Sequence, residues 1–438
     1  MNLKQPLLAI LAGAGILFGL ARPGPAQELK LGELLQEALA QNPELKAREA
    51  EVSAAAARVP QAGALPDPML TLGVMSLPVD SWSFSRETMT QKTVELSQEF
   101  PFPGKRPLLT RAAGAEREIA EARLGALRNL TVREVREAYA DLYYLDHALE
   151  INRQNQDLLQ QFVQVADSLY AVGKGLQQDV LKAQVEQSML LDQALMLESD
   201  RQIAAARLNR LLGRPVDQPL GLALQLPAEP LPPDPKVLAD QAVAKNPELV
   251  MSEKMTAESE AMEKLARRAS YPDFTVMLGY GQRDPVTMAG VKQETPDLVS
   301  GTVAFNLPIY SYRKQSRAVA ENQARVEQRR GEREDAALRV REEVAAAYAQ
   351  ARRAEQEIAL YQGGIIPQSE NVLKSALSGY QVNKVDFLTL LDSQKTLSDL
   401  KTKLYRLQAD SSQALARLDE LCARPPAEIL GQPTESTP

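Results

Sequence analysis

The sequence predicts a mainly helical protein with a small β part, written as one unit that occurs twice along the chain. Three observations support this prediction. One stretch of more than a hundred residues has no proline and is rich in helix-forming residues. Short motifs of the first half recur in the same order in the second half, and each half also contains short segments in which apolar and polar residues alternate.

The proline-free stretch lies between Pro107 and Pro215 and consists mostly of Ala, Leu, Glu, Arg, Gln and Lys, which all favour helix. Pro107 is acceptable in the first turn of a helix because its missing N–H would be unpaired there. We therefore expect a helix over about 108–171, roughly 100 Å long. A second helix over about 177–212 should run back and end at Gly213.

Composition and the chain ends indicate an exported protein. The formal net charge is −7, which argues against nucleic acid as a partner. Residues 1–26 have the pattern of a secretory signal peptide, with Lys4 before an apolar run and small residues at its end. An uncleaved anchor is the alternative, although the run is short for a spanning helix. Residues 425–438 are rich in Pro, Thr, Ser and Glu, and we expect them to be disordered.

The chain has few residues that could carry chemistry. Cys422 and His147 are single residues of their types, and we interpret both as packed or surface positions on helices. No nucleophile–base pair, glycine-rich phosphate loop or metal-ligand cluster is visible, so we predict no enzyme, no cofactor and no bound metal. Met69, Met75 and Met89 offer thioethers of the kind that suit Cu(I). They lack a paired spacing, so packing is the preferred interpretation.

Six motifs of the first half return in the second half at an offset of 204 to 210 residues. The clearest pairs are 40–45 with 244–249, 66–67 with 272–273, 99–101 with 306–308, 133–140 with 341–349, and 170–174 with 380–384. Chance similarity between helices does not explain six matches in the same order. We therefore predict two units, residues 27–214 and 236–424, joined by a proline-rich linker over 215–235.

Each unit contains two alternating segments about 8–10 residues long, which is the length of a tilted transmembrane strand. Polar residues such as Thr71, Glu95 and Ser300 separate the apolar ones. The apolar positions are Leu70, Leu72, Val74, Val94, Leu96, Phe100, Phe274, Val276, Leu278, Tyr280, Val299, Val303, Phe305 and Leu307. A soluble antiparallel sheet with one wet face is the alternative.

Four strands cannot close a barrel, and an open sheet edge cannot face lipid, because its N–H and C=O groups would stay unpaired. Two copies of the chain would supply eight strands with a filled interior, whereas three copies would supply twelve strands and leave a lumen. We therefore predict a homotrimer with a twelve-stranded transmembrane β-barrel and an α-helical barrel. In the second unit, Gly363, Gly364 and Pro367 should interrupt the long helix.

The doubled unit, the two Asn-Pro-Glu-Leu sites, Phe-Pro-Phe-Pro-Gly-Lys-Arg at 100–106 and Tyr-Ala-Val-Gly at 170–173 resemble the TolC-type outer-membrane efflux family. The resemblance covers about 29–423. It implies a trimeric duct in the outer membrane that extends through the periplasm. It also implies a periplasmic adaptor and an inner-membrane pump, here of the RND type, as partners. The Phe-Pro-Gly-Lys-Arg segment is similar to the heavy-metal efflux branch.

The resemblance further implies that two turns between helices, 170–179 and 380–392, meet the adaptor and close the channel. The candidate adaptor-contact residues are Tyr170, Val172, Gly173, Lys174, Gly175, Leu176, Tyr380, Val382, Asn383 and Lys384. Drug-efflux relatives carry two aspartates three residues apart at the second turn. Matched from Tyr380, these positions hold Thr389 and Asp392, so one acid is missing.

Asp179 is the counterpart of Thr389 in the first unit and is our candidate to replace the missing acid of the gate. The alternative is that Asp179 and Asp392 are charges near helix N-termini, where the helix dipole stabilises them. The predicted function is export of metal ions or small toxic compounds across the outer membrane. A duct for protein secretion and a periplasmic coiled-coil adaptor are the alternatives, although an adaptor has one hairpin and lacks strands of this length.

Overall fold

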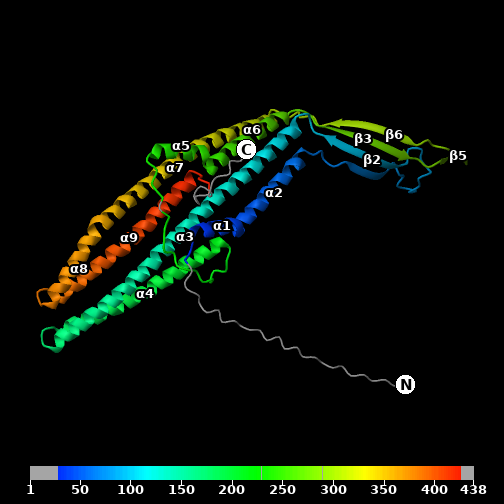
Figure 1. The fold of residues 1–438 in the computed structure, drawn as a ribbon. Coiled ribbons are helices and arrows are strands. Elements are labelled where there is room, and N and C mark those ends of the chain that lie inside the picture. Colours follow the sequence, from blue (N-terminus) through cyan, green and yellow to red (C-terminus); the bar gives the residue numbers. More distant parts are fainter. Residues whose placement is uncertain (1–27, 228, 289, 426–438) are drawn as a thin grey trace, which may run out of the picture.

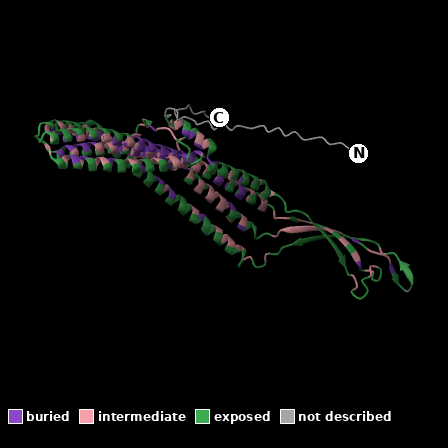
Figure 2. Ribbon diagram, turned by 90° about the horizontal axis from the view of Figure 1, so that it is seen from below, coloured by how far each residue is buried: buried purple, intermediate pink, exposed green. Residues whose placement is uncertain are grey.

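The computed structural model describes residues 28–227, 229–288 and 290–425. Figure 1 shows an elongated bundle of helices from which a sheet extends at one end, while two turns between helices lie at the opposite end. The predicted signal peptide and residues 426–438 of the predicted tail lie outside the described residues. Buried residues are concentrated in the helical part (Figure 2).

The first half begins with two short helices, α1 (Leu31–Gln41) and α2 (Pro43–Gly63). They separate at Asn42, as the Asn-Pro motif predicts, because the Asn42 side chain accepts hydrogen bonds from the first backbone N–H groups of α2. The helix-forming composition of 31–57 predicts a helical region that ends near residue 57. Instead α2 continues through Pro60 to Gly63, whose carbonyl accepts a 2.7 Å hydrogen bond from Arg106 Nε.

The long helix α3 (Lys105–Ala171) has 67 residues and is followed by α4 (Gln177–Leu212). The prediction of this hairpin is confirmed within three residues at its start, and Pro107 does lie in the first turn. Gly213 ends α4 in the left-handed conformation, with φ of 71°. Helices α1, α2 and α4 all pack along α3, so shorter helices flank the long one.

The second half is built in the same way. Its helices are α5 (Pro235–Lys245), α6 (Pro247–Arg268), α7 (Gln315–Leu360), α8 (Ile366–Gln381) and α9 (Phe387–Leu421). The predicted interruption lies between α7 and α8, where Tyr361–Ile365 form a π-helical segment, η1, that contains both glycines. Within the described residues, no helix is both long enough and apolar enough to cross a membrane.

The sheet has four antiparallel strands in the order β1-β2-β3-β6. Their bounds are Met69–Met75 for β1, Gln91–Phe100 for β2, Phe274–Gln282 for β3 and Leu298–Phe305 for β6. Strand β2 of the first half pairs with β3 of the second half, so the two halves share one sheet. A short hairpin of β4 (Val286–Met288) and β5 (Val291–Gln293) lies within 281–297, a segment whose polar sequence predicts a loop.

The register places the predicted apolar residues together on one face. One row across the sheet is Leu72, Val94, Tyr280 and Val299. The next row, whose side chains point to the other face, is Thr71, Glu95, Gly279 and Ser300. All residues of β1 and β6 are exposed, so no other described part of this chain covers the apolar face. Leu72 is 71% exposed and Val299 is 82% exposed.

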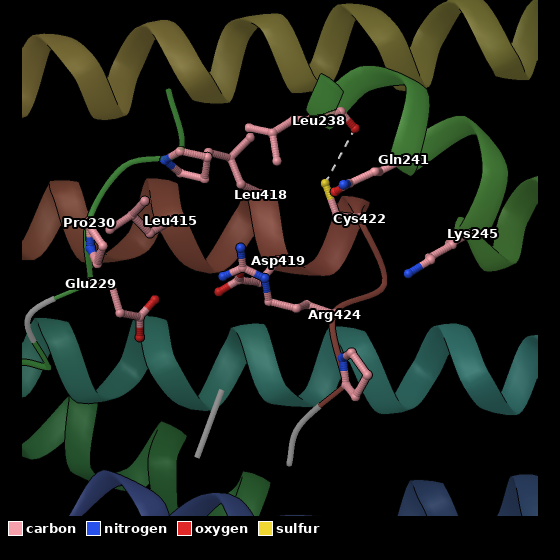
Figure 3. A pocket seen from close by; sticks show the side chains of 12 residues that line it. Glu229, Pro230, Leu238, Gln241, Lys245, Leu415, Leu418, Asp419, Cys422 and Arg424 are labelled. Atoms are coloured by element: carbon pink, nitrogen blue, oxygen red, sulfur yellow. Dashed lines mark hydrogen bonds and ion pairs between the residues drawn. The ribbon is translucent and has the colours of Figure 1, made fainter. Parts of the chain in front are cut away.

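A buried ionic cluster joins the two halves near the middle of the helical bundle. The Arg136 guanidinium is 1% exposed and contacts Asp419 of α9 and Glu229 of the linker, the latter at 2.7 Å. Arg424 contacts the same Asp419 at 3.0 Å. Figure 3 shows Glu229, Asp419 and Arg424 beside a pocket of about 250 Å³. Each charge of the cluster has an opposite partner, so removal of Arg136 alone would leave buried carboxylates without compensation.

The single cysteine and the single histidine both have packed surroundings. Cys422 is buried, and its Sγ points to the Leu238 carbonyl oxygen at 3.6 Å (Figure 3). Burial raises the pKa of its thiol. The His147 ring stacks on Tyr405 at 4.0 Å between ring centres and meets the edge of Tyr143. Both observations agree with the interpretation of these residues as helix packing positions.

Candidate functional site

The two turns between helices lie side by side at the end of the bundle opposite the sheet (Figure 1). The first turn joins α3 to α4, and the second joins α8 to α9. They carry the same backbone hydrogen bonds, since Lys174 N donates to Leu169 O at 2.8 Å and Lys384 N donates to Gly379 O at 2.8 Å. This pattern is the Schellman ending of a helix, in which one residue takes a left-handed conformation.

The left-handed residue differs between the turns. Gly173 has φ of 71° in the first turn and Asn383 has φ of 59° in the second. Glycine and asparagine are the residues that adopt this conformation at the lowest cost. Gly175 is constrained for another reason: a Cβ there would lie 2.9 Å from the backbone nitrogen of Tyr170. The first turn therefore depends on two glycines at specific positions.

The structure brings the two turns into contact. Asn383 Nδ2 donates a 3.2 Å hydrogen bond to the Lys174 carbonyl oxygen. A groove of about 330 Å³ lies between the turns and is lined by residues of both, including Lys174, Asp179 and Asp386. Apolar side chains of both hairpins pack together just above it, including Phe162, Val180 and Phe387. The turns form one surface with contributions from both halves.

Most of the predicted adaptor-contact residues are exposed on this surface. Val172 is 66% exposed, Leu176 is 62% exposed and Val382 is 62% exposed, so the two turns carry an exposed apolar surface. Tyr170 is 47% exposed. Such a patch at the end of a rod is suited to packing against apolar side chains of another protein.

Tyr380 differs from its counterpart Tyr170 because it points inward. It is 4% exposed and its ring lies 5.3 Å from that of Phe387. Its hydroxyl is buried and has no hydrogen-bond partner among the described residues. Burial raises the pKa of Tyr380, and the nearby Asp179 carboxylate raises it further. Tyr380 therefore offers little surface to an adaptor, and it contributes to the packing that joins the hairpins.

The three predicted gate residues lie on two helices, Asp179 on α4 and Thr389 and Asp392 about one turn apart on α9. Asp179 is the third residue of α4, is partly buried and lines the groove between the turns. Thr389 is the third residue of α9 and is exposed. Asp392 is exposed and lies beyond the first turn of α9, where the helix dipole acts weakly. The helix-dipole alternative therefore applies to Asp179 better than to Asp392, and the gate role of all three residues stays a prediction.

Sequence reasoning missed Asp386, which lies in the groove and is the N-cap of α9. Its carboxylate accepts a 2.7 Å hydrogen bond from the backbone N–H of Thr389. That hydrogen bond is the main cause of the lowered pKa of Asp386. An aspartate directly before the apolar start of a helix is a sequence signal for an N-cap. This signal would have identified Asp386.

No group of three or more His, Cys, Asp or Glu side chains in the described ranges is arranged to hold a metal ion. The acidic residues of the turns are therefore separate charges around a groove. This end of the molecule therefore combines exposed apolar side chains with separate acidic and basic charges.

Paired helices about 100 Å long and a small sheet with an uncovered apolar face define a class of protein, the elongated channel subunits of the outer membrane. The family model described as "Outer membrane efflux protein" matches residues 34–214 and 238–424. The chain belongs to the outer membrane efflux protein family. It is an outer-membrane efflux channel that extends into the periplasm.

Among characterised relatives, the chain is 24% identical over 409 residues to the cobalt-zinc-cadmium resistance protein CzcC of Cupriavidus metallidurans, covering 91% of both chains. Among solved structures, it is similar in fold to CusC, with a TM-score of 0.75 and 18% identity over 96% of this chain and 98% of that one. It is also similar to VceC of Vibrio cholerae, with a TM-score of 0.74 and 19% identity over 90% of this chain and 96% of that one. The resemblance to outer-membrane efflux channels is confirmed.

Proposed function

We propose that three copies of this chain form one duct through which an inner-membrane pump of the RND type exports heavy-metal cations. Twelve strands would close a β-barrel in the outer membrane, and the long helices would continue it as an α-helical barrel across the periplasm. The observation that carries the proposal is the four-stranded sheet, which has one apolar face and two unpaired edge strands, β1 and β6.

The physical argument concerns the backbone of the edge strands. In lipid, every unpaired N–H or C=O group costs several kcal/mol. Neither β1 nor β6 has a partner on its outer side among the described strands, and their apolar residues are exposed. A ring of three sheets pairs all edges, directs the apolar row to lipid and leaves the polar row around a water-filled lumen.

The proposal treats residues 27–214 and 236–424 as two copies of one unit, with 215–235 as the linker. Three such doubled chains give six pseudo-equivalent units around the duct. The recurring motifs support this division, and so do the identical hydrogen bonds of the two helical turns. The cargo assignment rests on the likeness to the cobalt-zinc-cadmium resistance protein, which covers 91% of both chains.

Both turns are proposed to meet a periplasmic adaptor, through the apolar patch of Val172, Leu176 and Val382. Asp179, Asp386 and Asp392 would line the narrow end, where three copies bring carboxylates close together. Like charges repel at short distance, so the closed state needs other contacts. The packing of Tyr380 and the hydrogen bond from Asn383 to Lys174 can supply them.

The barrel is tested with arginine on the two faces of one strand. Leu72→Arg places a charge on the apolar face, and we expect it to cost about 2–4 kcal/mol near the midplane of the bilayer. Thr71→Arg is the matched control on the polar face and should leave trimer yield unchanged. Membrane fractionation and the mass of the detergent-solubilised protein measure both variants. Equal yields, or a monomer outside the outer membrane, would contradict the proposal.

The cargo is tested by resistance. A strain that lacks this chain should lose tolerance to cobalt, zinc or cadmium salts and regain it with the plasmid-borne gene. Tolerance to organic toxic compounds, measured in the same strain, is the control and should change little. If only tolerance to organic compounds falls, the cargo is not a metal cation, and the duct assignment remains in place.

A further inference from the structure

The junction between the two halves is a template for an interface between copies. Where the chain leaves β2, it binds the residue that precedes β3. Asp273 accepts a 2.6 Å hydrogen bond from Phe102 N and is paired with Lys105 Nζ at 2.7 Å. The side chains of Lys105 and Asp273 are only 11% and 21% exposed. This partly buried ion pair therefore joins the end of one strand to the start of its neighbour.

Two further contacts belong to the same junction. The rings of Phe102 and Tyr271 stack with 4.6 Å between their centres. Strands β2 and β3 pair in one register, with Phe100 opposite Phe274. An ion pair, a stacked aromatic pair and the hydrogen-bonded strand register thus together fix how the end of β2 lies against the start of β3.

The free edges of the sheet carry the counterparts of these residues, because the motifs recur at a nearly constant offset. Asp67 stands before β1 as Asp273 stands before β3, and Leu65 corresponds to Tyr271. After β6, Ile309 corresponds to Phe102 at an offset of 207. At this offset Arg313 corresponds to Arg106, so the basic pair Arg313–Lys314 lies one residue further along than Lys105–Arg106.

The charged counterparts are exposed, whereas the Lys105–Asp273 pair is partly buried. The template ring of Tyr271 is itself 49% exposed. Asp67 is exposed, and no cation of the described residues lies within 4 Å of it. Arg313 and Lys314 are exposed as well, and neither has a carboxylate partner within the described part of the chain. Ile309 is 71% exposed and Leu65 is 38% exposed. One edge thus offers an acid and the other a pair of cations.

We propose that β6 of one copy pairs with β1 of the next in the register of the internal junction, so that Phe305 lies opposite Leu70 and Val303 opposite Leu72. In this junction Asp67 of the neighbouring copy binds the Arg313–Lys314 pair. Ile309 packs on Leu65 of the neighbouring copy. The inference rests on the proposed trimer and adds to it the register and the ion pair that join its subunits.

The register has an independent check in the faces of the sheet. It was transferred from Phe100 and Phe274 through the motifs that flank the strands, without reference to which side chains are apolar. The transfer nevertheless sets Leu72 of the apolar row opposite Val303, which the β3–β6 ladder places on the same face beside Val276. A shift of one residue would put lipid-facing residues opposite lumen-facing ones.

Cysteine pairs test the register. In the variant Thr71→Cys/Ala304→Cys, the two positions lie opposite each other across the proposed junction. Mild oxidation of the purified trimer should give a covalent trimer on a non-reducing gel, and reductant should return it to monomer. Leu70→Cys/Ala304→Cys, shifted by one residue, is the matched control and should cross-link poorly. Variants with only one of the two new cysteines are the control for disulfides with the native Cys422, which is buried.

Trimer mass in detergent is measured before oxidation, which separates the two proposals. A variant that is trimeric but cross-links equally through both pairs, or only through the shifted pair, overturns the register and leaves the trimer in place. Absence of a trimer in the unmodified protein overturns the proposed function itself.

Charge reversal tests the ion pair. Asp67→Lys, and separately Arg313→Glu/Lys314→Glu, should lower the temperature at which half of the trimers dissociate by several degrees. The triple variant restores an attractive pair and should recover most of the loss. Asp80→Lys, which breaks an exposed pair with Arg86 in the loop between β1 and β2, is the control and should have little effect. A triple variant no more stable than either reversal overturns the assignment of this ion pair.

Discussion

The two helical hairpins have the same plan but differ in continuity. In the first, α3 runs for 67 residues without a break. In the second, the corresponding length is divided into α7, the π-helical η1 and α8. Glycine reduces helix stability, and π-helical turns are frequent at functional sites. We therefore predict that the second hairpin bends more easily at η1 than the first hairpin does along α3.

The hairpins also differ in how they are anchored. Arg136 of α3 binds both the linker and α9. When the motifs are aligned on Tyr139 and Tyr348, its counterpart in α7 is Ala345, which has no charge to contribute. Arg136 is the most buried of several cations that join the two halves, since Arg133–Glu420 and Arg406–Asp141 also connect α3 with α9.

The largest expected effect is the loss of this anchor. Arg136→Met would leave Asp419 and Glu229 without their buried partner, and breaking a buried ion pair costs about 3–5 kcal/mol. Thermal melting followed by circular dichroism measures the loss. Arg341→Gln, which breaks an exposed pair with Asp240, is the control and should cost about 0–1 kcal/mol. Equal losses would mean that Arg136 is not an anchor.

The left-handed position of the first turn, Gly173, should accept asparagine but not a β-branched residue. Gly173→Val places a β-branched residue at φ of 71°, which costs about 1–2 kcal/mol. We expect an intact trimer that neither exports its cargo nor cross-links to the adaptor. Gly173→Asn copies the residue of the second turn, Asn383, and should keep both functions. Adaptor cross-linking that persists in the valine variant would place the docking surface elsewhere.

The π-helical segment gives a test of bending. Alanine at Gly363 and Gly364 meets nothing within 4 Å, so the double variant should gain up to about 1 kcal/mol per residue in helix stability. We expect a higher melting temperature together with slower export. Gly331→Ala in the uninterrupted part of α7 also meets nothing within 4 Å and should stabilise without slowing export. If both variants export at the normal rate, the break does not serve opening.

The smallest expected effects concern charge at the narrow end. Purified trimers in a planar bilayer should prefer cations, because rings of carboxylates favour them. Asp392→Ala should reduce this preference, and Asp179→Ala should reduce it only if the first turn reaches the lumen. Reversal potentials in a salt gradient measure the change. An unchanged preference in the double variant would remove the gate assignment without affecting the duct.

Asp386 gives the second turn a pH dependence of its own. Its pKa is lowered by the hydrogen bond from Thr389 N. The carboxylate therefore stabilises the start of α9 fully above the ordinary pKa of a carboxyl group, and this contribution is lost as the pH falls through the lowered value. Hydrogen exchange of the backbone amides near Thr389, measured as a function of pH, follows this transition. Asp386→Asn should abolish it. Asp67→Asn is the control and should leave it unchanged.

The helices and strands follow from local sequence. The absence of proline after Pro107, the caps at Asn42 and Gly213, and the alternation around Leu72 each act within a few residues, so their outcome can be read without the fold. The repeated motifs likewise indicate the class of protein. Errors occurred where distant segments intervene: α2 continues past Pro60 because it packs along α3 and Arg106 binds its last carbonyl group.

Only the tertiary structure decided what the side chains of the turns do. Tyr170 and Tyr380 are equivalent in the sequence, yet one is exposed and the other is buried beside Phe387. Asp386 is one of many aspartates until the helix start positions it in the groove, and Arg136 is one arginine of a helix until α9 and the linker surround it with acids. Burial and ion pairing depend on which segments meet in space, and local sequence does not contain that information.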